Sequence, residues 1–318
     1  RKYEEKHSMG AAVIPLYNKA NTIERAILSV LHQDTLPLEI VVIDDGSTDD
    51  GAQRVLQIPP SSVSIRLIAQ TNQGVSAARN RGIAESLGDW IAFLDADDEW
   101  HPAFLSMIIH LRRQYPSCTV AATAYQHIDQ RGTQQSITLQ RLPFEGDEGL
   151  LDNYFEVAAH SHPPFCSISV AARKDSLLAV GGFPRGIIAG EDLLTWARLA
   201  MQGTIAYSRK PLATFFPERA TYYSRPSRIP QEGDPVGTAL ERMLHESPST
   251  PGLKAYIAHW HKMRASIYLR LPHYERPCRE EIRKALVFDP SLRRKMRLYQ
   301  VLSFLPYRLR MKAFENLS

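Results

Sequence analysis

Four short apolar runs, each ending in polar or acidic residues, constrain the fold of this chain more than any other feature. The runs cover residues 11–16, 39–43, 64–69 and 90–94, and stretches with helical spacing cover residues 22–33, 49–57 and 76–86. Because the runs are continuously apolar and rich in β-branched residues, we expect strands that are covered on both faces. Alternation of such strands with helices predicts an α/β fold with a mostly parallel sheet.

Further elements are predicted beyond residue 100, where the pattern becomes less regular. Helical spacing covers residues 102–115 and 191–201, and strand-like runs cover residues 119–125, 167–172 and 213–216. The polar stretch 130–148 is typical of a hairpin or a loop. We expect the region 130–162 to form part of the wall that faces an acceptor.

The composition indicates one large globular core with an appended segment. Of the 318 residues, 44% are apolar and 23% are charged, which argues against a disordered chain. The longest apolar runs fall far short of the ~20 residues that a membrane-spanning helix needs. Cys118, Cys166 and Cys278 are far apart and lack a C-x-x-C pair, which argues against a disulfide framework and a zinc site. A reducing cytoplasm fits this cysteine usage best.

The chain divides into three parts by composition. Residues 1–8 are polar and precede Met9, so we expect a tag or a disordered start. A segment rich in proline and charge, residues 226–235, is typical of a hinge. We therefore predict a catalytic domain over residues 9–225 and a helical region over residues 226–318.

Two carboxylates, Asp95 and Asp97, follow the fourth apolar run. Side chains alternate along an extended chain, so we expect these two to point the same way and Ala96 to point to the other face. Two oxygen donors at one place suit Mg²⁺ or Mn²⁺, because these ions keep few protein ligands and take the others from phosphate and water. An isolated D-x-D is often only a solvated turn, so this prediction depends on the residues around it.

Polar side chains also follow the other predicted strands, at the edge where parallel α/β sheets bind ligands. Asp45 ends the second strand and is difficult to explain as a helix cap. Tyr17 ends the first strand and offers an aromatic ring to a nucleobase. Arg79 lies one turn into the helix 76–86, where it either clamps a phosphate or pairs with a surface carboxylate.

Taken together, the chain resembles family 2 glycosyltransferases of the GT-A fold, because six stretches occur in the order found in that family. They are residues 14–18 (IPLYN), 29–33 (SVLHQ), 42–49 (VIDDGSTD), 72–82 (NQGVSAARNRG), 93–98 (FLDADD), and 181–183 (GGF) followed by 190–192 (GED). The similarity extends from about residue 11 to about residue 216. It implies a Rossmann-like, mostly parallel sheet flanked by helices. Beyond the hinge the sequence pattern itself is helical, so we expect a helical C-terminal extension.

The resemblance also implies a function. The family transfers a sugar from a UDP-sugar or another nucleotide-diphosphate sugar to an acceptor hydroxyl, here a hexosyl or N-acetylhexosaminyl group in bacterial cell-surface polysaccharide or glycan synthesis. The nucleobase of the donor would stack on Tyr17, and Asp97 would be the main ligand of Mn²⁺ or Mg²⁺. The implied nucleotide-sugar-binding residues are Pro15, Tyr17, Asp45, Asn72, Arg79, Asp95 and Ala96, and the implied metal ligands are Asp97 and Asp95.

Glu191 and Asp192 resemble the catalytic acidic pair of the family, with Asp192 as the base and Glu191 as the alternative. A helix that begins after Gly190 would direct its positive end towards both carboxylates and favour their ionised forms. A carboxylate that accepts the proton of the attacking hydroxyl is a general base. One in-line displacement would invert the configuration of the anomeric carbon.

Two other functions have to be weighed against transfer. A degenerate GT-A protein would bind a nucleotide or a glycan without turnover, although the acidic residues named above speak against it. A sugar-phosphate nucleotidyltransferase would carry a glycine-rich basic loop after the first strand, where this chain has residues 15–19, PLYNK. Nucleic acid is not an expected partner, because no recognised binding motif accompanies the basic residues.

The segment 292–314 is basic and amphipathic. Its basic residues are Arg293, Arg294, Lys295, Arg297, Arg308, Arg310 and Lys312. One interpretation is docking on the anionic inner face of the cytoplasmic membrane, where a lipid-linked saccharide acceptor would be found. The other is a helix packed on its own core or on another subunit, which leaves a homo-oligomer open.

Overall fold

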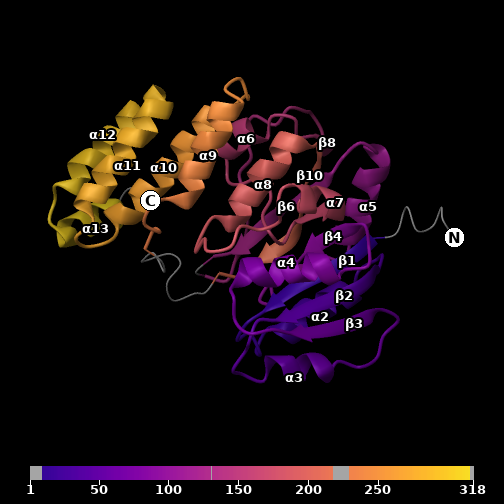
Figure 1. Ribbon diagram of the computed structural model, residues 1–318. Coiled ribbons are helices and arrows are strands. Elements are labelled where there is room, and N and C mark those ends of the chain that lie inside the picture. The colour runs from indigo at the N-terminus through magenta and orange to yellow at the C-terminus, as the bar shows by residue number, and fades with distance from the viewer. Residues whose placement is uncertain (1–8, 130, 218–228, 316–318) are drawn as a thin grey trace. The chain divides into compact units, whose positions relative to one another are not determined.

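The computed structural model describes residues 9–129, 131–217 and 229–315, which form two compact units (Figure 1). The first unit includes residues up to Asp152 together with Pro163–Gly186 and Gly190–Phe216. The second unit includes Asn153–His162, Ile187–Ala189 and the chain from Pro217 onward. The predicted start over residues 1–8 and the predicted boundary between residues 225 and 226 both lie outside the described residues, so they stay predictions.

The first unit is built on a ten-stranded sheet in the order β3-β2-β1-β4-β9-β6-β10-β5, with β7 beside β6 and β8 beside β10 (Figure 1). β1, β2, β3, β4, β6 and β10 run parallel to one another, and β9 is antiparallel to both β4 and β6. The predicted mostly parallel sheet is therefore confirmed. The strands are β1 (Met9–Leu16), β2 (Pro37–Asp44), β3 (Ser64–Ala69), β4 (Trp90–Phe93), β5 (Glu99–Trp100), β6 (Val120–Ile128), β7 (Gln134–Ser136), β8 (Glu148–Leu150), β9 (Val170–Arg173) and β10 (Ile205–Phe215).

Helices cover both faces of this sheet, which explains the continuously apolar strands. In β1, Ile14 joins the buried cluster formed with α2 and α5, whereas its neighbour Val13 faces α4. A Cβ on Gly82 of α4 would lie 2.3 Å from Val13 Cγ1, so this helix packs directly on the strand. The helices of the first unit are α2 (Ile23–Leu31), α3 (Gly51–Leu56), α4 (Val75–Glu85), α5 (Phe104–Gln114), α7 (Lys174–Ala179) and α8 (Glu191–Gln202).

The differences from the sequence prediction lie in the second half of the first unit. β10 begins at Ile205, although only residues 213–216 have a clear strand pattern, because two register shifts against β6 interrupt its alternation. In the polar stretch expected to be a hairpin or a loop, β7 pairs antiparallel with the end of β6, so the hairpin alternative is confirmed there. The predicted acceptor wall over residues 130–162 is divided, since α6 (Tyr154–His160) belongs to the second unit.

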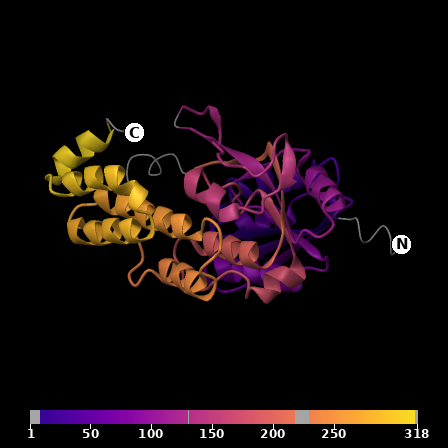
Figure 2. The same ribbon diagram turned by 90° about the horizontal axis from the view of Figure 1, so that it is seen from above.

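The second unit is helical, as predicted for the C-terminal region. Its core is formed by apolar residues of α10, α11 and α12, among them Leu269, Ile282 and Met296. α6 packs against α10, where Phe155 and Tyr256 have ring centroids 5.4 Å apart. Besides α6, the helices are α9 (Pro235–Glu246), α10 (Leu253–Leu269), α11 (Glu275–Phe288), η1 (Pro290–Leu292), α12 (Arg293–Ser303) and α13 (Tyr307–Glu315), which gather in both views (Figures 1 and 2).

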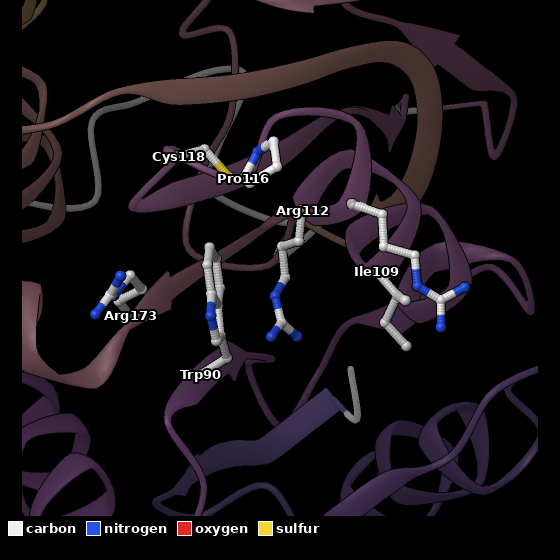
Figure 3. A pocket seen from close by; sticks show the side chains of 7 residues that line it. Trp90, Ile109, Arg112, Pro116, Cys118 and Arg173 are labelled. Carbon is white, nitrogen blue, oxygen red and sulfur yellow. The ribbon is translucent and has the colours of Figure 1, made fainter. Parts of the chain in front are cut away.

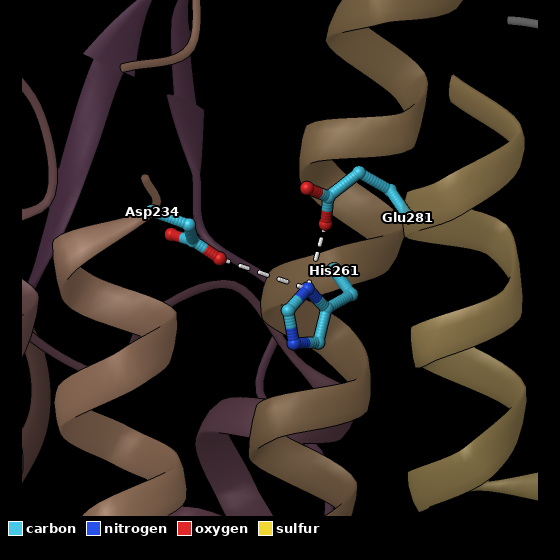
Figure 4. A group of neighbouring side chains, drawn as sticks. All are labelled: Asp234, His261 and Glu281. Carbon is cyan, nitrogen blue, oxygen red and sulfur yellow. Dashed lines mark hydrogen bonds and ion pairs between the residues drawn. The ribbon is translucent and has the colours of Figure 1, made fainter. Parts of the chain in front are cut away.

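A buried polar network ties α9, α10 and α11 together (Figure 4). His261 Nδ1 lies 2.6 Å from Glu281 Oε2 and 3.8 Å from Asp234 Oδ2. Arg264 Nε donates to Glu281 Oε1 at 3.0 Å, and its Nη1 lies 3.5 Å from Asp234 Oδ1. Trp260 Nε1 donates to Asp234 Oδ1 at 3.0 Å. Arg264 brings a positive charge to both carboxylates, and the network joins the three helices of the helical unit.

No helix in the described part of the chain combines the length and the apolar character needed to cross a lipid bilayer.

Candidate active site

The carboxyl edge of the parallel strands is organised around Asp45, which is 3% exposed. Asp45 Oδ1 accepts hydrogen bonds from Gln70 Nε2 at 2.8 Å and from the Gln73 amide at 2.9 Å. Its Oδ2 accepts one from the Gly74 amide at 2.8 Å. Asp45 therefore fixes the loop between β3 and α4, which carries the exposed Asn72. The hydrogen bond from Asp45 to a nucleobase stays a prediction.

Arg79 joins two parts of the chain that are far apart in the sequence. Its Nη2 lies 2.8 Å from Asp95 Oδ1, and its Nη1 lies 3.3 Å from Glu191 Oε1. Burial alone would lower the pKa of this guanidinium, but the charges of Asp95, Glu191 and Asp192 outweigh burial and raise the pKa above its ordinary value. Of the two roles left open for Arg79, the structure shows pairing with carboxylates, and these pairs lie in the site instead of on the free surface.

A second contact holds Arg79 in place from the side of residues 181–183. Asn80 Nδ2 donates to the Phe183 carbonyl at 2.8 Å, and the Phe183 amide donates to Asn80 Oδ1 at 2.8 Å. The Phe183 ring centroid lies 5.1 Å from the Arg79 guanidinium carbon. Gly182 has a φ of 66°, and a Cβ there would lie 2.4 Å from Asn80 Oδ1, so glycine is required for this approach. The GGF stretch thus supports Arg79.

Glu191 begins α8 directly after Gly190, whose φ of 89° allows the sharp turn that the sequence predicted. The side chain of Glu191 is 12% exposed. Burial, followed by the charge of Asp192, raises its pKa to about 7, although Arg79 acts in the opposite direction. The expectation that the helix terminus favours the ionised form of both carboxylates is therefore wrong for Glu191, because desolvation outweighs the helix.

Asp192 is held by neutral donors. Its Oδ2 accepts a hydrogen bond from Ser167 Oγ at 3.1 Å, and its Oδ1 accepts one from the Leu193 amide at 2.8 Å. Ser167 precedes β9 and is 5% exposed, so its buried hydroxyl holds the Asp192 carboxylate in one orientation. Asp192 and Glu191 therefore differ in their surroundings, since Glu191 is paired with Arg79.

Residues 95–98 form a turn in which the Asp98 amide donates to the Asp95 carbonyl at 3.1 Å. The extended backbone assumed for Asp95 and Asp97 is therefore wrong, because β4 ends at Phe93. Exposure nevertheless alternates along the turn, with 30% for the Asp95 side chain and 27% for that of Asp97, against 3% for Ala96. Asp95 and Asp97 thus reach solvent while Ala96 is buried.

The turn is crowded with negative charge. Asp97 Oδ2 lies 2.8 Å from Lys19 Nζ. Asp98 is 1% exposed, and its Oδ1 accepts a hydrogen bond from the Phe216 amide at 2.8 Å. Burial, together with the charges of Asp95 and Asp97, raises the pKa of Asp98 well above its usual value. A positive charge bound at the exposed carboxylates would relieve this repulsion.

The donors at Asp95 and Asp97 fit a hard divalent cation. Both offer carboxylate oxygens that are partly exposed, and Mg²⁺ or Mn²⁺ takes few protein ligands when phosphate and water complete the shell. The pairing of Asp97 with Lys19 means that a cation has to share this carboxylate with Lys19 or displace it. Occupancy by a metal ion stays a prediction.

The remaining predicted residues lie at or beside this edge. Tyr17 follows β1 and is 48% exposed, so its ring is accessible for stacking. Pro15 is half-buried within β1, where it pairs with Ile43 of β2. Asn72 is exposed in the loop that Asp45 holds. Their contacts with a nucleotide stay predictions.

Sequence reasoning missed Lys19, Ser167 and Asp98 as parts of the site. Lys19 follows the strand-1 turn and was weighed only as a departure from another enzyme class, whereas the structure pairs it with Asp97. Ser167 was included only as the first residue of a predicted strand, and nothing in its neighbours indicates that it donates to Asp192. Asp98 shares the acidic run, but only the backbone turn shows that it is buried.

Comparison with known proteins assigns the family. The family described as Glycosyl transferase family 2 matches residues 11–175, which are 165 of the 318 residues. The chain belongs to glycosyltransferase family 2. An uncharacterized glycosyltransferase of Rickettsia felis is 30% identical over 203 residues, which are 64% of this chain and 32% of the relative. The succinoglycan biosynthesis protein ExoO of Rhizobium meliloti is 46% identical over 98 residues, 30% of this chain and 28% of ExoO.

The match spans less than a third of the length of each of these two relatives. A solved structure is similar over nearly the whole chain: S. aureus TarS 1–349 in complex with UDP-GlcNAc has a TM-score of 0.68 and 17% identity, and the similarity covers 96% of this chain and 91% of that one. At this identity the likeness concerns the fold. The predicted GT-A architecture with a helical C-terminal region is therefore confirmed.

Proposed function

We propose that this family 2 protein transfers a sugar from a UDP-sugar, or another nucleotide-diphosphate sugar, to an acceptor hydroxyl with inversion at the anomeric carbon. The observation that carries the proposal is the position of Arg79, which is buried between Asp95 after β4 and Glu191 at the start of α8. This contact brings the D-x-D turn and the Glu-Asp pair to one place at the carboxyl edge of the sheet. Donor and base can then act on opposite sides of one sugar.

Asp192 is the proposed general base. Ser167 orients its carboxylate, and its described hydrogen bonds come from neutral groups, so it can accept a proton without breaking an ion pair. Glu191 would first have to lose its pairing with Arg79. Glu191 is therefore assigned to positioning Arg79, which in turn positions Asp95.

On the donor side, Asp95 and Asp97 are the proposed holders of a divalent cation. A Mg²⁺ or Mn²⁺ ion bound there would stabilise the negative charge that grows on the leaving diphosphate. Tyr17 would stack on the base, and the loop held by Asp45 would place Asn72 beside the nucleotide. Lys19, which lies beside Asp97, adds a further positive charge at the same place.

The names of similar proteins support a sugar nucleotide donor and a role in polysaccharide synthesis. The TarS structure contains UDP-GlcNAc, which favours a UDP-linked hexose or N-acetylhexosamine as donor. ExoO is named as a succinoglycan biosynthesis protein, which favours a glycan or a lipid-linked saccharide as acceptor. A bacterial cell-surface polysaccharide is the proposed product class.

A donor screen tests the proposal. The protein is incubated with UDP-, GDP- and TDP-linked sugars in the presence of Mn²⁺ or Mg²⁺, and released nucleoside diphosphate is measured by a coupled assay. We expect slow hydrolysis of one UDP-sugar to exceed that of the others, since water replaces the acceptor in the same displacement. If UDP binds in calorimetry but no donor is hydrolysed, the chain is instead a nucleotide-binding protein without turnover.

The C-terminal helices lead to a second proposal, docking on an anionic cytoplasmic membrane surface. One face of α12 packs inward through Met296, Tyr299 and Leu302. For this face, the predicted packing of the tail on its own core is therefore correct. The opposite face exposes Val301 at 62%, and Phe304 just after the helix at 69%. The exposed basic residues of α12 and α13 are Arg293, Arg294, Lys295, Arg297 and Arg308. Arg310 is excluded from this surface, because it is buried and pairs with Glu275.

Vesicle co-sedimentation tests membrane docking. The protein is expected to bind phosphatidylglycerol vesicles and not phosphatidylcholine vesicles, because each basic residue near an anionic surface contributes about 1 kcal/mol. Replacing both Val301 and Phe304 by Asp should reduce binding at least about tenfold, since it removes apolar contact and adds negative charge. Leu56→Asp, at a residue of α3 that is 73% exposed, is the matched control. Binding that is absent, or equal in all variants, would exclude docking through this face.

A further inference from the structure

A pocket of about 440 Å³ lies at the other end of β4 from Asp95 (Figure 3). Its lining residues come from the start of β4, the end of β9, α5 and the loop that follows α5. They are Trp90, Ile109, Arg112, Arg113, Pro116, Cys118 and Arg173. Trp90 and Arg173 are register partners in the sheet. β4 covers about 10 Å from Trp90 to Phe93 at the usual rise per residue of a strand, and Asp95 follows its other end. The pocket is therefore separate from the candidate active site.

Three of the seven lining side chains are arginines, and none of the seven is acidic. The Arg112 guanidinium carbon lies 4.4 Å from the centroid of the Trp90 ring, so this cation is held against an aromatic face. Figure 3 shows Arg112 and Arg173 on either side of Trp90. The nearby acids are Asp175, which pairs with Arg173 at 2.6 Å, and Asp89, whose charge acts on Arg112 and Arg173.

The surroundings act in different directions on the arginines of the pocket, since a hydrogen bond with Asp175 raises the pKa of Arg173. Burial lowers the pKa of Arg112 to about 10, and the charges of Arg113 and Arg173 act in the same direction. Burial also raises the pKa of Cys118 to about 11, so the sulfur stays a neutral thiol at pH 7 and does not compensate these cations. A bound anion would favour the charged form of Arg112.

Helix electrostatics explain only part of this arrangement. Arg112 and Arg113 lie in the last turn of α5, where a positive charge is favourable in any helix. That argument does not apply to Arg173, which is at the end of a strand and lines the same pocket. Arginines from two separate elements therefore line one cavity, and the Nε and Nη2 groups of Arg173 also donate to Asp175 at 3.1 and 2.6 Å.

We infer that this pocket binds a small phosphorylated compound through Arg112, Arg113 and Arg173. Guanidinium groups match phosphate oxygens in bidentate geometry, which favours a phosphoryl group over a simple halide. The volume lies within the range of about 300–1,000 Å³ that is usual for ligand pockets. It exceeds the need of phosphate alone, so the chemistry fits an organic phosphate of the size of a sugar phosphate, either free or as the headgroup of a lipid.

Calorimetry tests this inference with inorganic phosphate, inorganic pyrophosphate and glucose 6-phosphate as probes. EDTA is present throughout, so that no metal ion at Asp95 and Asp97 holds the probe. We expect the wild-type protein to bind glucose 6-phosphate or pyrophosphate. Arg113→Met and Arg173→Met should each weaken binding at least about tenfold, because each removes a charged hydrogen-bond donor. Both side chains are exposed, so the fold should persist.

Two comparisons locate the site and identify the source of the phosphoryl group. Arg276→Met removes the same charge from a side chain of the second unit that is 87% exposed, and it should leave binding unchanged. Phosphatidylglycerol vesicles test whether the phosphoryl group belongs to a lipid headgroup. That source is assigned if the wild-type protein binds vesicles but no soluble probe, and if both pocket variants abolish vesicle binding. If neither vesicles nor soluble probes bind, or if the pocket variants bind like Arg276→Met, the inference is wrong.

Discussion

Replacing Asp192 by Asn is expected to reduce sugar transfer by about a hundredfold to ten-thousandfold, the usual contribution of a general base. The amide keeps the size of the side chain and can still accept a hydrogen bond from Ser167 Oγ, but it cannot take the proton of the acceptor hydroxyl. Affinity for UDP should change little, because Asp192 is not among the predicted nucleotide contacts. Transfer rates with the donor found in the screen, together with calorimetry of UDP binding, give both quantities.

Glu191→Gln and Asp175→Asn are the controls for this variant. Glu191→Gln resembles the protonated side chain that a pKa of about 7 already favours below neutral pH, so a smaller loss of transfer is expected. Asp175→Asn alters an exposed carboxylate that pairs with Arg173 after the end of β9, whereas Ser167, which donates to Asp192, precedes β9. This variant should leave transfer unchanged. If Asp192→Asn retains transfer while Glu191→Gln abolishes it, Glu191 is the base and Asp192 is not.

The parallel part of the sheet could be predicted because the composition of its strands indicates that both of their faces are buried. Residues 40–43 of β2 are apolar without interruption and are fully buried, as expected for a strand that helices cover on both faces. β9 and β10 lack this signal. β9 is four residues long, and the register shifts of β10 break the period of two, so their pairing depends on contacts that the local sequence does not encode.

The candidate site was predictable as a set of residues and not as a set of contacts. Position after a strand placed Asp45, Asp95 and Tyr17 at one edge, because the carboxyl ends of parallel strands meet there. The pairing of Arg79 with Glu191 spans 112 residues, and no pattern in either segment indicates it. The sequence also does not indicate the contacts that distinguish Asp192 from Glu191. Adjacent helical residues point in different directions, and only the packed structure shows which groups each side chain contacts.

Replacing Asp97 by Asn should reduce metal-dependent transfer by at least about a thousandfold, since a bound cation contributes several kcal/mol to stabilising the leaving group. The fold should be nearly unaffected. Asp97 and its partner Lys19 are both partly exposed, and pairs of this kind contribute at most about 1 kcal/mol to the free energy of unfolding. A large kinetic effect without a matching shift in melting temperature therefore separates a ligand role from a structural one.

Manganese titration of donor hydrolysis measures this effect directly. The wild-type protein should lose activity in EDTA and recover it on addition of Mn²⁺ or Mg²⁺, whereas Asp97→Asn should need a much higher metal concentration. Asp49→Asn is the matched control, because Asp49 follows β2 and its carboxylate accepts hydrogen bonds from the amides of Ala20 and Gly51. Its replacement should leave the metal requirement unchanged. Full activity in EDTA would exclude a cation at Asp95 and Asp97, and stabilisation of the departing diphosphate would then fall to Lys19 and Arg79.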